Sequence, residues 1–153
     1  MIPSTVARVR ENTDYEINQR IQREIEANVA LFAAQGDEAI ARRLRELDRE
    51  WDIERTLEAN AATAVLVSSA LGFTINRRFL AFPIVIGGFL LQHAVQGWCP
   101  PLPILRRLGF RTESEINQER FALKALRGDF DRSGDSSEFS PCAAQAMTSA
   151  ARV

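Results

Sequence analysis

Residues 59–97 read ANAATAVLVSSALGFTINRRFLAFPIVIGGFLLQHAVQG, and Arg77 and Arg78 are the only formally charged side chains among them. The sequence on either side of this stretch is dense in charge. Its two uncharged parts, 59–76 and 79–97, are each close to the ~20 residues that a helix needs to cross the hydrocarbon core of a bilayer. The stretch therefore predicts a transmembrane hairpin of two antiparallel helices joined by a short turn.

The fold class expected for the whole chain is all-α, with amphipathic helices before and after the hairpin. The expected parts are cytoplasmic amphipathic helices over 1–58, the hairpin over 59–99 with its turn at 76–78, a Pro-rich turn and helix over 100–130, and a disordered tail over 131–153. A net charge of −1 without a clustered basic face argues against a nucleic-acid partner. Two cysteines are too few for a disulfide framework.

The N-terminal part carries two helix patterns. A capping box at Thr13–Glu16 opens the first helix, which Gly36 is expected to end. The second helix has a narrow apolar stripe, surrounded by charge, formed by Ile40, Leu44, Leu47 and Trp51. Because its basic and acidic residues nearly cancel, we expect the stripe to pair with another helix rather than to lie on a membrane surface.

The orientation of the hairpin follows from its arginines. Eight flank it on the two outer sides and two lie in its turn, so the excess of positive charge favours both termini inside. No N-terminal stretch resembles a signal peptide. The expected location is the bacterial inner membrane, as a multi-pass protein. The residues expected to anchor it at the two interfaces are Trp98, Arg77, Arg78, Arg106 and Arg107.

Small residues predict how the two helices pack. Ala64, Ser68 and Gly72 repeat at a spacing of four, which lets helices approach closely in lipid. Gly87 and Gly88 offer the second helix a thin place for the first helix to lie against. The first helix contains several polar residues, and its packing against the second would compensate for its modest hydrophobicity.

Polar residues gather where the second helix ends. His93 is the only histidine and could bind a haem or another metallated ring; the alternative is a histidine hydrogen-bonded to a neighbouring helix or to Gln96. Gln92 belongs to the same polar group. No metal-binding spacing of His and Cys is present, so neither a metal nor another cofactor is predicted.

Cys99 follows this polar group. It could be a reactive thiol whose pKa is lowered by Arg106 and Arg107 if the turn through the prolines brings them close. The alternative is a small residue packed at the membrane interface, beside Trp98 as an aromatic anchor. No resolving cysteine lies at a CxxC spacing.

The segment Gly97-Trp98-Cys99-Pro100, followed by Leu105 to Gly109 and Thr112, resembles the YgaP-like transmembrane domain family. That family is a small bacterial inner-membrane hairpin of largely unknown function, sometimes preceded by a rhodanese sulfurtransferase domain. The resemblance covers about 59–112, implies a link to sulfur handling at the membrane, and makes Cys99 the counterpart of the family's cysteine. The 58 residues before the hairpin are too short for a rhodanese domain.

These features predict a non-enzymatic membrane protein that acts as an accessory subunit of a membrane complex or as a homo-oligomer. Its expected partners are membrane lipid and other membrane subunits or further copies of itself. The alternatives are a sulfur-handling or redox component that uses Cys99 and, with less support, a haem- or pigment-binding protein that uses His93. A soluble helical bundle is the structural alternative.

Overall fold

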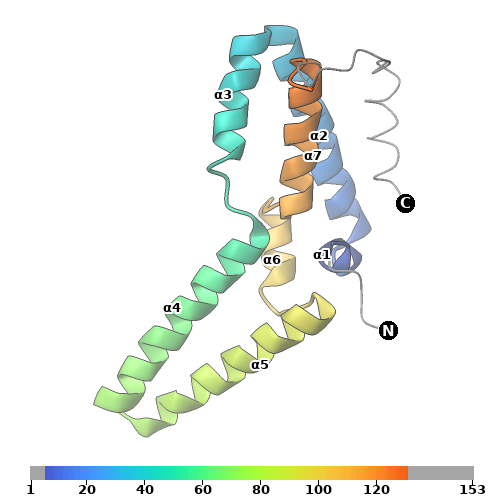
Figure 1. The fold of residues 1–153 in the computed structure, drawn as a ribbon. Coiled ribbons are helices and arrows are strands. Elements are labelled where there is room, and N and C mark those ends of the chain that lie inside the picture. Colours follow the sequence, from blue (N-terminus) through green and yellow to red (C-terminus); the bar gives the residue numbers. More distant parts are fainter. Residues whose placement is uncertain (1–5, 131–153) are drawn as a thin grey trace. The chain divides into compact units, whose positions relative to one another are not determined.

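The structure, a computed structural model, describes residues 6–130 of the 153-residue chain. These residues form seven α-helices and one 3-10 helix, and within them there is no strand, so the all-α prediction is confirmed. The tail expected to be disordered, 131–153, lies outside the described residues. The chain divides into two compact units, which are described separately (Figure 1).

The first unit, here called the helix-pair unit, is drawn from Met1–Ile21 and Trp51–Glu113. Its elements are α1 (Arg8–Glu11), the first turns of α2 (Tyr15–Gln35), α4 (Ile53–Thr74), η1 (Arg77–Leu80), α5 (Ala81–Gln96) and α6 (Leu102–Arg107). In Figure 1, α4 leads away to η1 and α5 returns beside it, so the two long helices are antiparallel neighbours. The end where α4 begins and α5 ends is called the base of this pair.

Local capping explains where these helices begin and end. Asp52 caps α4, because its carboxylate accepts a 2.6 Å hydrogen bond from the backbone N–H of Arg55. The helix therefore starts six residues earlier than the expected start at 59 and includes charged residues in its first turns. At the turn, the Asn76 side chain accepts from Arg78 N at 2.9 Å. Gly97 ends α5 in the left-handed conformation, with φ of 75°.

The base of the pair has its own core. Val9, Ile53, Leu57, Cys99 and Leu102 form a buried apolar cluster, with Leu105 and Phe110 packed against it. Val9 of α1 belongs to this cluster, so the short helix before α2 contributes to the core. Gly97 permits the contact, since a Cβ at that position would lie 2.6 Å from the Cβ of Arg8.

The second unit, here called the bundle unit, is drawn from Gln22–Glu50 and Ser114–Val153. It consists of the rest of α2, α3 (Asp37–Leu47) and nearly all of α7 (Glu113–Leu126). Its buried core comes from α3 and α7, with two α2 residues packed against it: Ile40, Leu44, Leu47, Ile116 and Leu123, with Val29 and Phe32. This is the ordinary arrangement of amphipathic helices in water, with the apolar stripes turned inward.

The stripe expected on the second N-terminal helix is correct for three of its four residues. Ile40, Leu44 and Leu47 are buried, but α3 ends at Leu47 and Trp51 belongs to the helix-pair unit. Trp51 is exposed, and the Arg55 guanidinium lies over its ring at 4.5 Å. The capping box expected at Thr13 is also absent: its hydroxyl donates to Val9 O at 2.7 Å and accepts from Arg106.

Candidate functional site

The helix-pair unit exposes an unusual amount of apolar surface. Its long helices and the turn between them leave large apolar side chains uncovered: Leu66, Val67, Phe73, Ile75, Phe82, Ile84, Val85, Phe89, Leu91 and Val95. Ile84 is 76% exposed and Phe73 is 82% exposed. Large exposed apolar surfaces on soluble proteins usually mark a site that meets another molecule or a membrane.

One stretch of this surface has the properties of a membrane span. Arg77–Gln96, which combines η1 and α5, is long and apolar enough to cross a bilayer by length and composition, and within residues 6–130 it is the one helix that is. Only 6% of its most apolar window is buried. A core helix of a soluble protein would instead be mostly buried, so exposure separates α5 from that class of helix.

The exposed apolar surface has polar or amphipathic residues at both ends. Trp51 precedes α4 and Trp98 follows α5, so both exposed tryptophans lie at the base. Arg77 and Arg78 are exposed at the opposite end, in η1. Trp51 was expected on the apolar stripe of the second N-terminal helix and not among the anchors; the signal for its place at the base is its position one residue before the N-cap Asp52.

The burial pattern shows which faces of α4 and α5 contact each other. The least exposed residues of α5 recur at helical spacing: Pro83, Ile86, Leu90 and His93. Those of α4 do the same: Leu57, Ala61, Val65, Ser68 and Gly72. Of the predicted small-residue stripe, Ser68 and Gly72 are therefore on the contact face, whereas Ala64 is exposed.

The expected role of Gly87 and Gly88 is wrong. Both are exposed, and a Cβ at either position would meet nothing within 4 Å. They fall outside the face that carries Pro83, Ile86 and Leu90. The close approach occurs at Gly72 instead, where a Cβ would lie 2.5 Å from Leu80 Cδ2.

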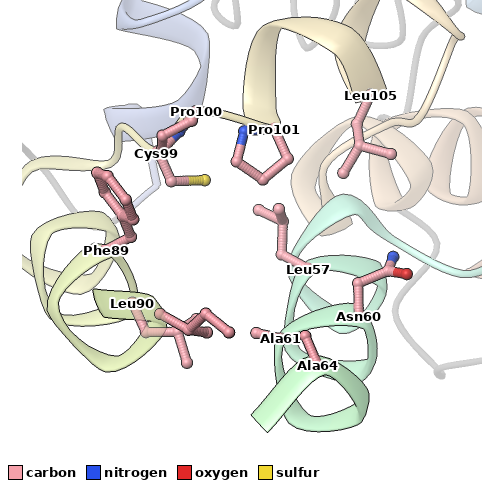
Figure 2. A pocket seen from close by; sticks show the side chains of 11 residues that line it. Leu57, Asn60, Ala61, Ala64, Phe89, Leu90, Cys99, Pro100, Pro101 and Leu105 are labelled. Atoms are coloured by element: carbon pink, nitrogen blue, oxygen red, sulfur yellow. The ribbon is translucent and has the colours of Figure 1, made fainter. Parts of the chain in front are cut away.

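A pocket of about 310 Å³ lies between α4 and α5 near their base (Figure 2). Its lining comes from α4, α5, α6 and the segment that joins the last two: Leu57, Asn60, Ala61, Ala64, Ile86, Phe89, Leu90, Cys99, Pro100, Pro101 and Leu105. Figure 2 shows the Cys99 sulfur pointing into it. Asn60 is the one amide in the lining, and its Nδ2 donates to Thr56 O at 2.8 Å within α4.

The surroundings of Cys99 do not activate its thiol. Cys99 is buried, and this burial raises the pKa of the thiol, although a backbone hydrogen bond from Leu102 acts in the opposite direction. The direction is the reverse of the one expected from neighbouring arginines. A protonated thiol is a poor nucleophile, so Cys99 behaves here as a small apolar residue.

Arg106 is not an interface anchor. It is 0% exposed, and its guanidinium donates to Thr13 Oγ1 at 3.2 Å, Asn18 Oδ1 at 2.9 Å and Phe110 O at 3.0 Å. It therefore ties α6 to the start of α2. Arg107 is exposed and lies 3.7 Å from the Asp14 carboxylate, while Trp98, Arg77 and Arg78 are exposed as expected of anchors.

His93 is 8% exposed, and both of its ring nitrogens are buried with no hydrogen-bond partner among residues 6–130. The expected bond to Gln96 is not formed; Gln96 is exposed, and its carbonyl accepts from Asn12 Nδ2 at 2.9 Å. Gln92 is half-buried. His93 does not line the pocket, and no group of three or more His, Cys, Asp or Glu able to hold a metal occurs in the described part of the chain.

Arg8 connects α1 to both long helices near His93. Its Nη2 forms a 2.8 Å ion pair with Glu54 of α4, and its Nη1 donates to Ala94 O of α5 at 3.4 Å. The Nε of Arg8 is a further buried donor without a partner in the described structure. Arg8 therefore adds an ion pair and a contact with the α5 backbone to the apolar core at the base of the pair.

No protein-family model, no curated protein and no solved structure matches this chain. The resemblance to YgaP-like transmembrane domains stays a prediction that rests on the residues quoted above.

Proposed function

We propose that this chain is a non-enzymatic integral membrane protein of the bacterial inner membrane. In this proposal α4, η1 and α5 form a transmembrane hairpin that attaches the bundle unit to the membrane. The protein acts as an accessory subunit of a membrane complex or as a homo-oligomer. The observation that carries the proposal is the exposed apolar surface of α5 and outer α4, bordered by Trp51 and Trp98 at one end and by Arg77 and Arg78 at the other.

The weaker of the two proposed spans, α4, contains polar residues that need an explanation. Three of its hydroxyls bond within the helix: Thr63 donates to Ala59 O at 2.7 Å, Ser68 to Ala64 O at 2.6 Å and Thr74 to Ala70 O at 2.7 Å. These three hydroxyl donors would therefore keep their partners in lipid. A polar group in the bilayer core needs such an internal hydrogen bond. These three hydroxyls therefore do not oppose insertion of α4 beside α5.

Both termini are proposed to be cytoplasmic. Tryptophans favour the membrane–water interface, and the base carries both of them. The segments before and after the hairpin also carry more arginines than its turn does, and such an excess favours the cytoplasmic side. Arg77 and Arg78 would then lie at the far interface, where their charged groups can reach lipid phosphates.

The bundle unit supplies support for assembly with a partner. A groove of about 350 Å³ runs between α2 and α7 and is lined largely by small or apolar residues: Ile25, Val29, Ala30, Ala33, Ala122 and Leu126, with Gln22, Glu26 and Gln118. Leu31, Phe121 and Leu126 of these two helices are exposed. Such surfaces suit helix pairing between subunits.

Membrane extraction and one-sided labelling test this proposal together. We expect the protein to stay in the membrane pellet after alkaline carbonate, since two spans resist extraction. In a cysteine-free background, Arg78→Cys should react with a membrane-impermeant maleimide added to intact cells, and Gln35→Cys should react only after lysis. Release by carbonate would reject the membrane assignment, and reaction of both cysteines from the same side would reject the hairpin.

The two alternative functions have less support. Burial raises the pKa of Cys99, which opposes a reactive thiol in sulfur handling. His93 does not line the pocket beside α5, so a haem or pigment bound there would not reach its ring. Both alternatives stay open to direct test through persulfide transfer to Cys99 and the visible absorption spectrum of the purified protein.

A further inference from the structure

We propose that the pocket between α4 and α5 binds one acyl chain of a membrane phospholipid. The inference rests on the proposed membrane insertion and adds a specific lipid site to it. Such a site differs from the general lipid contact of the outer apolar surface, because it holds one chain between helices of a single protein.

The pocket is an apolar space bounded on two sides by the long helices. One wall is the α4 face with Leu57, Ala61 and Ala64, and the other is the α5 face with Phe89 and Leu90 (Figure 2). Pro100 and Pro101 close the basal side of the space. The small side chains on α4 leave room that larger residues would fill.

The apolar lining of the pocket does not suit water molecules. A pocket of about 310 Å³ is large enough for several waters, and each of them would need two to four polar partners. The lining offers the Asn60 amide, whose Nδ2 already donates to Thr56 O. The two prolines have no backbone N–H to contribute. Hydrocarbon loses nothing in such a space, whereas water would lose hydrogen bonds.

The position of the pocket indicates that the hydrocarbon in it comes from a membrane lipid. Phe89 lines it and also belongs to the exposed apolar surface of α5, so the pocket is continuous with the surface proposed to meet lipid. Cys99 and Pro100, which line its basal end, directly follow Trp98 in the chain, and tryptophan is typical of the boundary between headgroups and acyl chains. The occupant reached from that boundary is a phospholipid tail whose headgroup stays at the interface.

The test uses the full chain reconstituted in nanodiscs of phosphatidylethanolamine and phosphatidylglycerol. A fraction of the phosphatidylglycerol carries a photoreactive diazirine in the part of one acyl chain that is closest to the headgroup. After illumination, mass spectrometry locates the cross-linked peptides. We expect cross-links on the segment Cys99–Leu105 as well as on the outward-facing residues Ile84 and Leu91.

Variants that fill the pocket make the assignment specific. Ala61→Phe places a ring inside the pocket, and Ala64→Phe does the same from a more exposed lining position. Ala62→Phe is the matched control, because Ala62 is exposed on the same helix and is not part of the lining. We expect the Cys99–Leu105 cross-link to fall several-fold in both filling variants and to be unchanged in the control.

The possible outcomes separate this inference from the proposed function. Cross-links on Cys99–Leu105 that persist in both filling variants, or cross-links confined to Ile84 and Leu91, would overturn the acyl-chain site while leaving membrane insertion intact. Absence of all cross-links, together with release of the protein by carbonate, would overturn the membrane proposal itself.

Discussion

The bundle unit buries the apolar side chains of α3, whereas the helix-pair unit exposes most of the apolar side chains of α5. In α3, Ile40, Leu44 and Leu47 are buried and most of the charged residues face outward. In α5, most of the apolar residues face outward and nothing in the unit covers them. Both helices are regular, and their backbone hydrogen bonds are satisfied. The difference in exposure therefore indicates the surroundings that each helix suits, and not how well each helix is folded.

In both units the buried polar networks lie in the cores. In the bundle unit, Glu119 is 0% exposed and accepts from Arg43 Nε at 2.7 Å, while Arg43 also lies 5.6 Å from the centre of the Phe32 ring. In the helix-pair unit, Arg106 is buried at the base and not among the exposed helices. Polar networks therefore appear where helices meet in a core, and the exposed part of the helix pair has none of comparable burial.

The largest effect is expected from removing the buried guanidinium at the base. Arg106→Ala leaves Phe110 O and the Asn18 side chain without their charged donor and opens a cavity, which should lower the free energy of unfolding by about 3–5 kcal/mol. Denaturant titration in nanodiscs, followed by tryptophan fluorescence at the base, measures this loss.

Arg107→Ala is the matched control, since it removes the same side chain from the next position. Arg107 is exposed and 3.7 Å from Asp14, so its loss should cost less than about 1 kcal/mol. Equal effects of the two variants would contradict the distinction between a buried structural arginine and an interfacial one.

Much of this architecture could be predicted from the sequence because it depends on local patterns. Gly36 ends α2, the 3.6-residue spacing of Ile40, Leu44 and Leu47 gives the buried face of α3, and Asn76 marks the turn before η1. Each of these features is set by residues within a few positions of one another. Helix propensity, capping and hydrophobic spacing act at that range.

The errors concern contacts between distant segments. Arg106 was expected at an interface because it lies just after an apolar stretch, but its partners Thr13 and Asn18 are about ninety positions away. Gly87 and Gly88 were assigned to the helix contact from residue size, whereas the contact face is fixed by the rotation of α5. Neither the partner of a charge nor the rotation of a helix is encoded in its own short segment.

A second comparison uses one substitution in both units. Leu123→Ala removes a fully buried side chain from the bundle core and should cost about 3 kcal/mol in free energy of unfolding. Leu91→Ala removes a 67% exposed side chain from α5 and should change stability by less than about 0.5 kcal/mol. Thermal unfolding of the two variants in the same nanodiscs measures both; a large loss for Leu91→Ala would mean that α5 packs against another protein surface.

A charge placed in the middle of the proposed span distinguishes lipid from water. Val85 is exposed, so in water Val85→Lys would be nearly neutral, but at the centre of a span a lysine costs about 2.5–3.5 kcal/mol. We expect a smaller carbonate-resistant fraction for this variant. Leu108→Lys is the control, because Leu108 is equally apolar and exposed but lies outside the proposed hairpin, and its membrane fraction should not change. Unchanged insertion of Val85→Lys would contradict the assignment of α5 to the bilayer.

The smallest effect is expected at His93. This prediction tests whether the imidazole at the end of the helix pair where α5 ends is purely structural. Its two ring nitrogens are buried without partners in the described structure, so His93→Phe removes a desolvation cost without breaking a hydrogen bond. The variant should be as stable as the wild type or slightly more stable, within about 0.5 kcal/mol. His93→Gln keeps buried polar atoms in the same place and should be less stable than His93→Phe by thermal unfolding. The reverse order would contradict an imidazole that is buried without a partner.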